Sequence, residues 1–468
     1  MKWQVAGNRI LVIGMARSGQ AAVKLLLKAG ASRVIANDQK QWENLQRDAG
    51  RLLEDPRVTY VGGGHPEDLL KDVAMVIKSP GVKPELPILK RAAADSIPVY
   101  SEIELAYRFS PTAIIGITGT NGKTTTTSLV GEMLKKQFGR VYVAGNIGFP
   151  LCEAVNLAEK EDVIVAELSS FQLENIDQFR SPIAAILNIS PDHMDYHGTM
   201  KQYIKSKSKL LINQRKNDVA VMNFDDPEVR ALSSHAKGRV LFFSRKNTLE
   251  SGVFMVNGNI VLMEKEEVAF SCPADDLRIP GTHNLENALA AVAVSWSKGV
   301  CSEHINGALK TFRGVPHRLE FVAEKDGVTF INDSKATNLE AAITALKAIP
   351  GRKILIAGGL DKGSVFEPLI STFKVENVHN LVLLGETAPL IQKAALREGF
   401  ANVVMVDSLA EAVAQAYDMA SKGDTVLLSP ACASWDMFKS FEERGDVFKS
   451  EVFKLEEGLY YGKSPRRA

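Results

Sequence analysis

The chain has 468 residues, of which 45% are hydrophobic and 24% are charged, and its formal net charge is +1. This length predicts about three domains, and the near-zero charge provides no basic field that would attract nucleic acid. No apolar run approaches the roughly 20 residues that span a bilayer, so we expect neither a nucleic-acid partner nor membrane insertion. The 4 cysteines are scattered without a Cys-x-x-Cys pair, which argues against a zinc site or a disulfide framework and favours a cytoplasmic location.

Strand and helix patterns alternate along most of the chain, which predicts α/β domains with mostly parallel sheets. A βαβ unit opens the chain, with a strand at 9–14, a helix at 18–28 and a strand at 33–37. The turn between the first strand and the helix has Ala16 where a dinucleotide-binding turn has its second glycine, so it favours a nucleotide diphosphate over NAD. Proline-containing connections, the last at Ser110-Pro111, predict that this first domain ends at residue 110.

Residues 113–127, AIIGITGTNGKTTTT, follow with a β-branched strand, a glycine-rich turn, Lys-Thr and a helix-competent segment. This order predicts a phosphate loop, in which backbone N–H groups and the Lys123 ammonium hold a polyphosphate and the Thr124 hydroxyl reaches Mg²⁺. Ile117 stands where the Walker pattern requires its first glycine, and the glycine lies at 119 instead. The shorter loop indicates a particular relative of the P-loop enzymes.

Two further segments carry candidate metal ligands. Glu167 ends the apolar strand DVIVAE, where a carboxylate can hold Mg²⁺ beside nucleotide phosphates; a solvated glutamate is the alternative. Residues 188–211 then place two aspartates and two histidines in a loop before an amphipathic helix. Their spacing matches no common zinc pattern, and by themselves the three lysines of this helix would form a solvated face. These residues are Asp192, His193, Asp195, His197, Lys205, Lys207 and Lys209.

The next segments predict a hairpin that turns at Asn257-Gly258 and a helix at 281–299 with Thr282 or Asn284 near its N-cap. Gly314–Pro316 is a candidate hinge before the last domain.

Three loops in the last third each follow a strand and carry small and polar residues. They are Asn332–Asn338, Gly358–Gly363 and Ser429–Ser434, with Ser434 as a candidate N-cap of the following helix. Cations and a helix N-terminus at the ends of neighbouring strands would form an anion site. Taken singly, each loop could instead have only a capping or surface role.

Together these motifs resemble the Mur ligase family of cell-wall peptide ligases, and the likeness covers essentially the whole chain. The short phosphate loop is itself a trait of that family, which accounts for Ile117. The loops at 332–338 and 429–434 point to the member that adds D-glutamate. The motifs are TGTNGKTT (118–125), AELSSFQLE (166–174), NISPDHMDYHG (188–198), GTHNLENALAA (281–291), PHRLE (316–320), NDSKATN (332–338) and SPACASWDMFKSFEERG (429–445).

The resemblance implies an α/β protein of three domains. These are a Rossmann-like N-terminal domain for the UDP end of the substrate (1–110), a central P-loop ATPase-like domain with a mostly parallel sheet (111–314) and a C-terminal Rossmann-like domain for the amino acid (315–468). It also implies an ATP-dependent ligase that adds D-glutamate to UDP-N-acetylmuramoyl-L-alanine through an acyl phosphate, in peptidoglycan precursor synthesis. We expect a cytoplasmic monomer that uses ATP, a pair of Mg²⁺ ions and a CO₂-derived carbamate on Lys207.

The family's carbamylated lysine lies four residues after a tyrosine, and Lys207 has that relation to Tyr203. A carbamate would turn this amine into a carboxylate-like Mg²⁺ ligand. The resemblance implies these roles: catalysis by Lys123, His193, Lys207 and Lys335; metal binding by Thr124, Glu167, His193 and Lys207; ATP binding by Gly119, Thr120, Asn121, Gly122, Lys123, Thr124, Thr125, Asn284, Asn287, Arg318 and Asp333; substrate binding by Ser18, Asp38, Asn146, Ser169, Thr337, Lys362, Ser434 and Phe441.

Three alternatives explain less of the chain. A folate polyglutamate synthase would share the phosphate loop and the lysine but would lack the first domain and the SPACAS loop. A nicotinamide-dependent oxidoreductase would explain only the N-terminal turn. A regulatory P-loop switch protein would explain residues 118–125 but not the loops of the last third.

Overall fold

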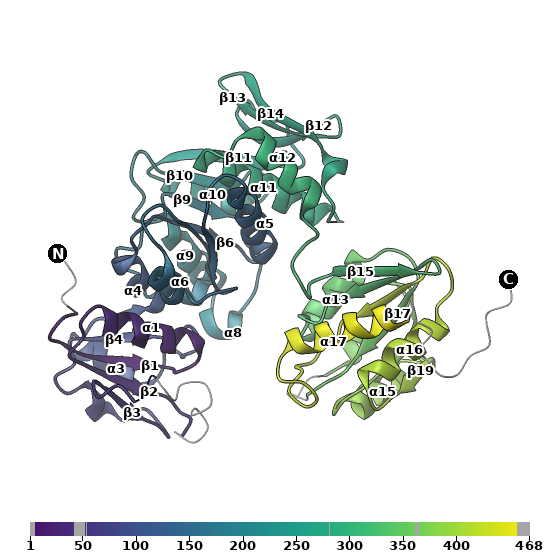
Figure 1. Cartoon of the computed structure of the whole chain (residues 1–468), viewed down its shortest axis with the longest axis horizontal. Helices are drawn as coiled ribbons and strands as arrows, with labels where there is room; N and C mark the ends of the chain where they lie inside the picture. The colour runs from purple at the N-terminus through teal and green to yellow at the C-terminus, as the bar shows by residue number, and fades with distance from the viewer. Residues whose placement is uncertain (1–4, 42–51, 53, 280, 361–364, 456–468) are drawn as a thin grey trace. The chain divides into compact units, whose positions relative to one another are not determined.

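The structure, a computed structural model, describes residues 5–41, 52, 54–279, 281–360 and 365–455 (Figure 1). The chain forms two compact units, Met1–Phe312 and Arg313–Ala468, and each is described by itself. The first unit contains two sheets and the second contains one. This architecture confirms the predicted α/β class with mostly parallel sheets.

The N-terminal sheet has five parallel strands in the order β3-β2-β1-β4-β5, the doubly wound arrangement of a Rossmann-like domain. Side chains alternate between its faces: Ile10 and Val12 pack with α1 and α4, whereas Leu11 and Ile13 pack with α3. The elements are β1 (Arg9–Ile13), α1 (Arg17–Lys28), β2 (Arg33–Asn37), β3 (Val58–Val61), η2 (Glu67–Leu70), β4 (Met75–Lys78), α3 (Pro87–Ala94), β5 (Val99–Ser101) and α4 (Glu102–Phe109).

The central sheet has nine strands in the order β14-β13-β12-β11-β10-β9-β6-β8-β7. It is parallel from β7 to β12 and antiparallel beyond, where the predicted hairpin turns at Asn257-Gly258. The strands are β6 (Ile114–Thr118), β7 (Val141–Gly145), β8 (Val163–Glu167), β9 (Ile183–Ile186), β10 (Val219–Asn223), β11 (Arg239–Ser244), β12 (Gly252–Val256), β13 (Asn259–Glu264) and β14 (Glu267–Pro273). The helices are α5 (Lys123–Lys135), α6 (Leu151–Leu157), α7 (Ser170–Glu174), α8 (Met194–His197), α9 (Met200–Ser208), η3 (Lys209–Leu211), α10 (Pro227–Leu232), η4 (Ser233–His235), η5 (Ala274–Asp276), α11 (Thr282–Lys298) and α12 (Ser302–Thr311).

The C-terminal sheet has the order β15-β16-β20-β17-β18-β19, with only β15 antiparallel. Alternate side chains of its strands pack against α16 and α17 on one face and against α13, α14 and α15 on the other. The elements are β15 (Glu320–Lys325), β16 (Val328–Asn332), α13 (Leu339–Ala348), β17 (Lys353–Ala357), α14 (Glu367–Ile370), β18 (Val378–Leu383), α15 (Ala388–Arg397), β19 (Val403–Met405), α16 (Leu409–Met419), β20 (Thr425–Leu428) and α17 (Phe441–Lys454).

One of the two predictions about helix starts is confirmed and the other is wrong. The N-cap of α11 is Gly281, with a φ of 100° that suits glycine, so Thr282 lies next to the N-cap as expected. Ser434 caps no helix, because the next helix begins only at Phe441, and the Ser440 hydroxyl accepts the Glu443 N–H there. The carbonyl of Ser434 instead accepts the N–H groups of Met437 and Phe438 in a turn.

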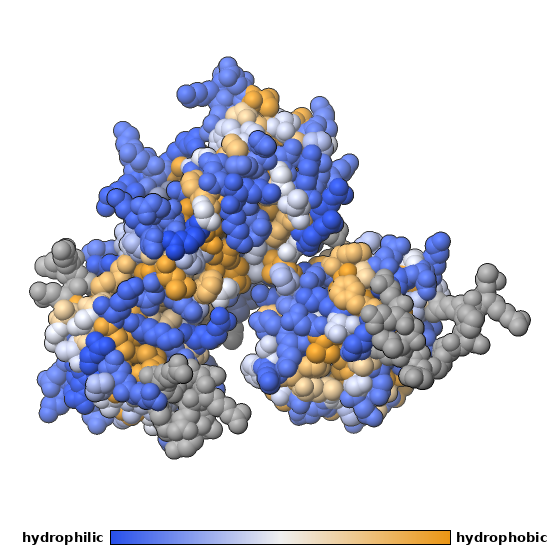
Figure 2. All heavy atoms as spheres, viewed as in Figure 1, coloured by the Kyte–Doolittle hydropathy of each residue, from blue (hydrophilic) through white to orange (hydrophobic). Residues whose placement is uncertain are grey.

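Hydrophilic residues cover much of the visible face of both units, with hydrophobic residues between them (Figure 2). Among the residues that the structure describes, no helix has the length and apolar character needed to cross a membrane.

The first residue of α4, Glu102, is a buried carboxyl between the N-terminal and central sheets. Helix α4 packs against α6, and Glu102 Oε1 accepts the Cys152 N–H at 2.6 Å. Its other oxygen, Oε2, is buried without a hydrogen-bond partner. Burial raises the pKa of Glu102 from 4.5 to about 7, while the hydrogen bonds from Cys152 act in the opposite direction.

Glu102→Gln should therefore remove a pH-dependent cost of folding. Between pH 4.5 and about 7 the folded state holds a proton that the unfolded state has lost, so stability falls as pH rises through this window. The free energy of unfolding of the variant relative to the wild type should rise by about 3 kcal/mol from pH 4.5 to pH 8 in urea titrations. Glu132→Gln, at a half-exposed position on α5, is the control. An equal pH dependence in wild type and Glu102→Gln would contradict the assignment.

Candidate active site

The register of the central sheet places the phosphate loop beside the candidate acid. Ile117 on β6 pairs with Glu167 on β8, and Thr118 pairs with Ile186 on β9. Because these strands are parallel, the segments that follow them emerge at one edge of the sheet. Helix α5 begins there at Lys123, with Gly122 at φ 79° as its N-cap.

Residues 188–190 hold the phosphate loop in position. The Asn188 carbonyl accepts the Thr120 N–H at 2.9 Å, and its side chain accepts the Asn121 N–H at 2.7 Å. The Thr120 hydroxyl accepts the Ser190 N–H at 3.0 Å and lies 3.1 Å from the Tyr203 hydroxyl. The loop is therefore held by contacts to the segment that follows β9 and to α9, as well as by its own sequence.

Two lysines share one acceptor in this loop. Lys123 Nζ donates to the Gly119 carbonyl at 3.0 Å and to the Thr120 carbonyl at 2.7 Å. Lys207 Nζ donates to the same Gly119 carbonyl at 2.7 Å and lies 4.5 Å from the centroid of the Tyr203 ring. Two predicted catalytic residues, 84 positions apart in the sequence, are thus brought together.

Lys207 is the buried lysine of its helix, with a relative exposure of 1%, whereas Lys205 is exposed. Burial lowers the pKa of Lys207 from 10.5 to about 7, and the Lys123 charge lowers it further, against the opposing effects of Asp192 and Glu167. A large share of this amine is therefore neutral near pH 7. A neutral amine is a nucleophile, whereas an ammonium is not.

Glu167 has the environment of a cation ligand. Its side chain is 1% exposed, and Oε1 accepts the Asn146 amide at 2.8 Å. The other oxygen, Oε2, is buried without a hydrogen-bond partner, although it lies at the edge of the sheet next to the phosphate loop. A carboxylate with one fixed oxygen and one unpartnered buried oxygen fits a Mg²⁺ ligand. Thr124 is buried in the first turn of α5 at this edge.

His193 lies differently from the other expected metal ligands. Its side chain is 49% exposed, 3.5 Å from Asp192, and its ring packs on Phe171. Within the described residues, no hydrogen bond, ion pair or ring contact joins His193 to Glu167 or Lys207, and no three His, Cys, Asp or Glu side chains form a metal-binding group.

The expected adenine residues lie on α11, which packs against α5. The Asn287 side chain accepts the Thr126 hydroxyl at 3.4 Å and donates to Asn284 Oδ1 at 3.2 Å. An added Cβ on Gly122 would lie 2.0 Å from Asn287 Oδ1, so the glycine permits close approach of the two elements.

Two of the expected substrate residues lie beside the N-terminal sheet, Asp38 directly after β2 and Ser18 in α1. Asp38 accepts the Met15 N–H at 2.6 Å and the Lys40 N–H at 2.9 Å, so it fixes the turn that opens α1, where Ser18 lies half-buried. In the central sheet, Ser169 caps α7 in a capping box with Gln172, which gives its hydroxyl a structural role already.

In the second unit, the three predicted loops do lie side by side. They follow β16, β20 and β17, which are neighbours in the sheet. Gly358 N–H donates to the Pro430 carbonyl and Leu360 N–H to the Ala433 carbonyl, both at 2.9 Å. Lys362 lies outside the described residues. Thr337 follows β16, its N–H bonded to the Lys335 carbonyl, and Ser434 is buried after β20.

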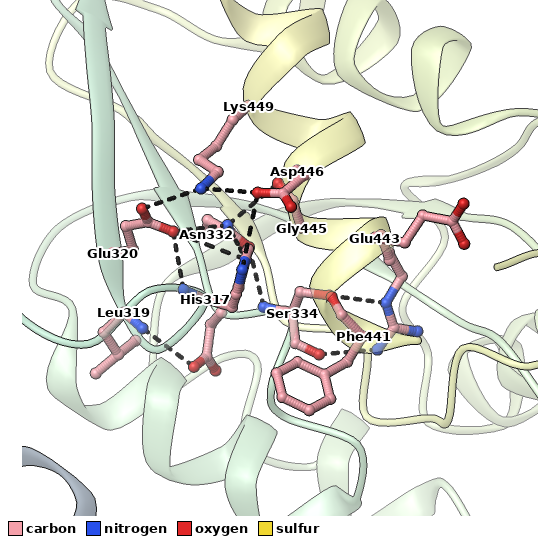
Figure 3. Close-up of polar contacts among 12 residues, drawn as sticks. His317, Leu319, Glu320, Asn332, Ser334, Phe441, Glu443, Gly445, Asp446 and Lys449 are labelled. Atoms are coloured by element: carbon pink, nitrogen blue, oxygen red, sulfur yellow. Dashed lines mark hydrogen bonds and ion pairs between the residues drawn. The ribbon is translucent and has the colours of Figure 1, made fainter. Parts of the chain in front are cut away.

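The segment that carries Arg318 has a constrained backbone. His317 and Leu319 both have positive φ, 63° and 45°, which is uncommon for residues other than glycine. Glu320 accepts the His317 N–H and the Asn332 side chain, at 2.8 and 2.9 Å, and its other oxygen lies 3.4 Å from Lys449 (Figure 3).

Asp333 adds to this support. Its oxygens accept the Leu319 N–H at 3.2 Å and the Ser429 hydroxyl at 2.8 Å. Burial raises the pKa of Asp333 to about 7, against the opposing effect of these hydrogen bonds. Lys335 Nζ lies 5.7 Å from the centroid of the Phe441 ring, so these two expected ligands are brought together.

Several residues of this architecture were missed by sequence reasoning. Asn188 supports the phosphate loop, and the buried Lys78 joins the end of β4 to the Tyr196 hydroxyl at 3.4 Å. Arg444 joins two of the C-terminal loops. For Asn188, its position just past an apolar strand was the available signal; the other two gave none.

A glycine-rich loop, a helix-start lysine and a buried acid at one edge of a parallel sheet define an ATP-binding α/β enzyme of the P-loop type. Comparison with known proteins refines this class. The Mur ligase MurD-like N-terminal domain matches residues 8–101, the Mur ligase middle domain residues 117–295, and the Mur ligase glutamate ligase domain residues 317–432. The chain belongs to the Mur ligase family.

Individual relatives match nearly the whole chain. A protein of Caldanaerobacter subterraneus subsp. tengcongensis, named UDP-N-acetylmuramoylalanine–D-glutamate ligase, is 47% identical over 96% of this chain and 98% of its own length. A protein of Clostridioides difficile with the same name is 44% identical over 96% and 99%. UDP-N-acetylmuramate-alanine ligase of Thermotoga maritima shares the fold, with a TM-score of 0.58 at 19% identity over 96% of this chain and 99% of its own.

Gly122→Ala should weaken both ATP binding and folding. The new Cβ would force Asn287 away and would occupy a left-handed backbone conformation, at a cost of about 1–3 kcal/mol. We expect a higher KM for ATP in steady-state assays and a lower free energy of unfolding in urea. Gly139→Ala, where an added Cβ has open space, is the control. An unchanged KM for ATP and unchanged stability would contradict the contact between α5 and α11.

Proposed function

We propose that this protein is an ATP-dependent ligase that adds D-glutamate to UDP-N-acetylmuramoyl-L-alanine in peptidoglycan precursor synthesis. The observation that carries the proposal is the placement of Lys123 and Lys207 on one carbonyl of the phosphate loop, beside the unpartnered oxygen of Glu167. The full-length relatives named as D-glutamate ligases support the choice of amino acid. We further propose that the enzyme acts as a monomer in the cytoplasm, with domain boundaries after residues 110 and 314.

The proposed reaction has two steps. The L-alanyl carboxylate attacks the γ-phosphorus of ATP, which gives an acyl phosphate and ADP. The D-glutamate amine then attacks the acyl carbonyl, an amide forms, and inorganic phosphate leaves with one oxygen of the original carboxylate. Lys123 and the N–H groups at the start of α5 would stabilise the negative charge that develops on the transferred phosphoryl group.

The residues of the first unit fit Mg²⁺, since Glu167 has an unpartnered buried oxygen and Thr124 lies at the same edge of the sheet. Bound Mg²⁺ would neutralise phosphate charge and align the γ-phosphate with the carboxylate. We propose that Thr124, Glu167, His193 and Lys207 hold a pair of such ions. The exposed side chain of His193 would have to turn toward the others.

We propose a carbamate on Lys207. Its burial and the neighbouring Lys123 charge disfavour a cation at this amine. Its hydrogen bond of 2.7 Å to the Gly119 carbonyl places it at the phosphate loop, where a carboxylate could meet a metal ion. CO₂ would add to the neutral amine with loss of one proton. The product would replace the unfavourable pair of neighbouring cations, Lys123 and Lys207, by an opposite-charge pair.

For the remaining ligands we propose the following roles. Asn284 and Asn287 hold adenine, Asp333 the ribose, and Arg318 and Lys335 phosphate; Gly119, Thr120, Asn121, Gly122 and Thr125 line the phosphate loop; Thr337, Lys362, Ser434 and Phe441 hold D-glutamate; Ser18, Asp38, Asn146 and Ser169 hold the UDP substrate.

Phosphate release tests the proposed function directly. With ATP and UDP-N-acetylmuramoyl-L-alanine present, we expect phosphate release to require D-glutamate and to match the amount of ligated product. L-Glutamate in place of D-glutamate is the control substrate. Release that is independent of D-glutamate, or turnover of NAD(P)H, would refute the ligase assignment.

Lys207→Ala should lower kcat by at least about 100-fold, because it removes the proposed charged group next to the transferred phosphate. Added formate or acetate should restore part of the activity by taking the place of the carbamate. Lys205→Ala, an exposed position on the same helix, should retain full activity. Full activity in Lys207→Ala would eliminate the carbamate proposal.

A further inference from the structure

Arg444 is a buried cation that holds two separate loops of the second unit. It lies in the first turns of α17 and is 2% exposed. Its guanidinium donates to Ser334, to the hydroxyl at 3.0 Å and to the carbonyl at 2.9 Å. On the other loop it donates to the Cys432 carbonyl at 3.1 and 3.2 Å and to the Ala433 carbonyl at 3.4 Å.

Both loops carry an expected ligand directly after the residue that Arg444 binds. Lys335 follows Ser334, and Ser434 follows Ala433. Ser334 makes a further hydrogen bond to the start of α17, since its hydroxyl donates to the Phe441 carbonyl at 2.8 Å (Figure 3). The loop at 332–338 also carries Thr337, which we propose holds D-glutamate together with Ser434. One guanidinium therefore sets the separation between two loops that would face the same amino acid.

The third loop is connected to the same carbonyl. Ala433 O accepts the Leu360 N–H at 2.9 Å as well as the Arg444 guanidinium. An added Cβ on Gly359 would lie 2.2 Å from that oxygen, so the two loops are in close contact. Displacement of Arg444 would consequently loosen all three loops at the edge of this sheet.

The charge of Arg444 is not cancelled by a carboxylate. All of its acceptors are carbonyl or hydroxyl oxygens, and among the described residues it forms no ion pair. Asp436, whose charge acts on it from a distance, instead accepts the Glu386 N–H at 3.0 Å. Burial lowers the pKa of Arg444 to about 10, which leaves the group cationic at neutral pH.

Hydrogen bonds to neutral oxygens offset only part of the desolvation cost of a buried cation, and an anion bound nearby would offset more of it. A neutral residue could hold loops by hydrogen bonds without that cost. The positive potential of Arg444 therefore favours an anionic ligand at this edge of the sheet. The charge of Lys335, near the Phe441 ring, contributes to the same potential.

We propose that Arg444 is the positioning residue of the amino-acid site: it sets the distance between the Lys335 and Ser434 loops and biases the site toward an amino acid with a second carboxylate. This inference rests on the proposed function. Arg444 acts through the two loops and through its field, and it does not itself contact the substrate.

The test compares two variants. Arg444→Met removes both the charge and the guanidinium N–H donors, whereas Arg444→Lys keeps the charge but not the geometry of those donors. We expect the KM for D-glutamate to rise about 10- to 100-fold in Arg444→Met, and the KM for the UDP substrate to stay within about twofold of wild type. The KM for ATP should rise less than that for D-glutamate, since Asp333 and Lys335 lie on only one of the loops that Arg444 holds. The preference for D-glutamate over D-glutamine should fall in Arg444→Met and persist in Arg444→Lys. Lys454→Met, on the exposed end of α17, is the control.

Thermal unfolding of each variant separates loss of fold from loss of positioning, and Arg444→Lys serves if Arg444→Met does not fold. A parallel rise of all three KM values, or an unchanged KM for D-glutamate in folded variants, would overturn the role of Arg444 alone. A wild-type enzyme whose phosphate release ignores D-glutamate would overturn the proposed function and this inference with it.

Discussion

The Gly119 carbonyl, shared by Lys123 and Lys207, is the contact on which the rest of the active site depends. Two ammonium groups on one acceptor would repel each other, and this repulsion together with the burial of Lys207 keeps a large share of its amine neutral near pH 7. Bound anions would make the arrangement favourable, either a polyphosphate on the loop or the proposed carbamate on Lys207. This is why we propose an anionic, metal-binding state of the phosphate loop.

The parallel strands bring the residues of each site together, because the loops that follow them emerge at one edge of the sheet. In the central sheet, the pairing of Ile117 with Glu167 places this acid beside the phosphate loop. In the second unit, β16, β20 and β17 are neighbours, so the three loops that follow them lie at one edge of the sheet. Polar side chains then hold these loops in place through hydrogen bonds. Asp333 and Arg444 do this in the second unit, and Asn188 does it in the first with a neutral amide.

Sequence patterns correctly predicted those secondary-structure elements that are determined by residues close together in the chain. The βαβ unit, the hairpin at Asn257-Gly258 and the helix after the phosphate loop depend on neighbouring residues and were found correctly. Composition alone could not separate Lys207 from Lys205, because their burial differs only once α9 packs on the loop. Arg444 could not be predicted because its partner Ser334 is 110 positions away. The missed cap at Ser440 had a local signal, Glu443 three residues later.

The central claim, activation of a carboxylate by ATP, can be tested by following one atom. The L-alanyl carboxylate of the UDP substrate is labelled with a heavy oxygen isotope, and the phosphate released during ligation is analysed by mass spectrometry. Passage through an acyl phosphate predicts one labelled oxygen in each phosphate, because the bond between the carbonyl carbon and that oxygen breaks in the second step. Unlabelled phosphate accompanying ligated product would contradict the account.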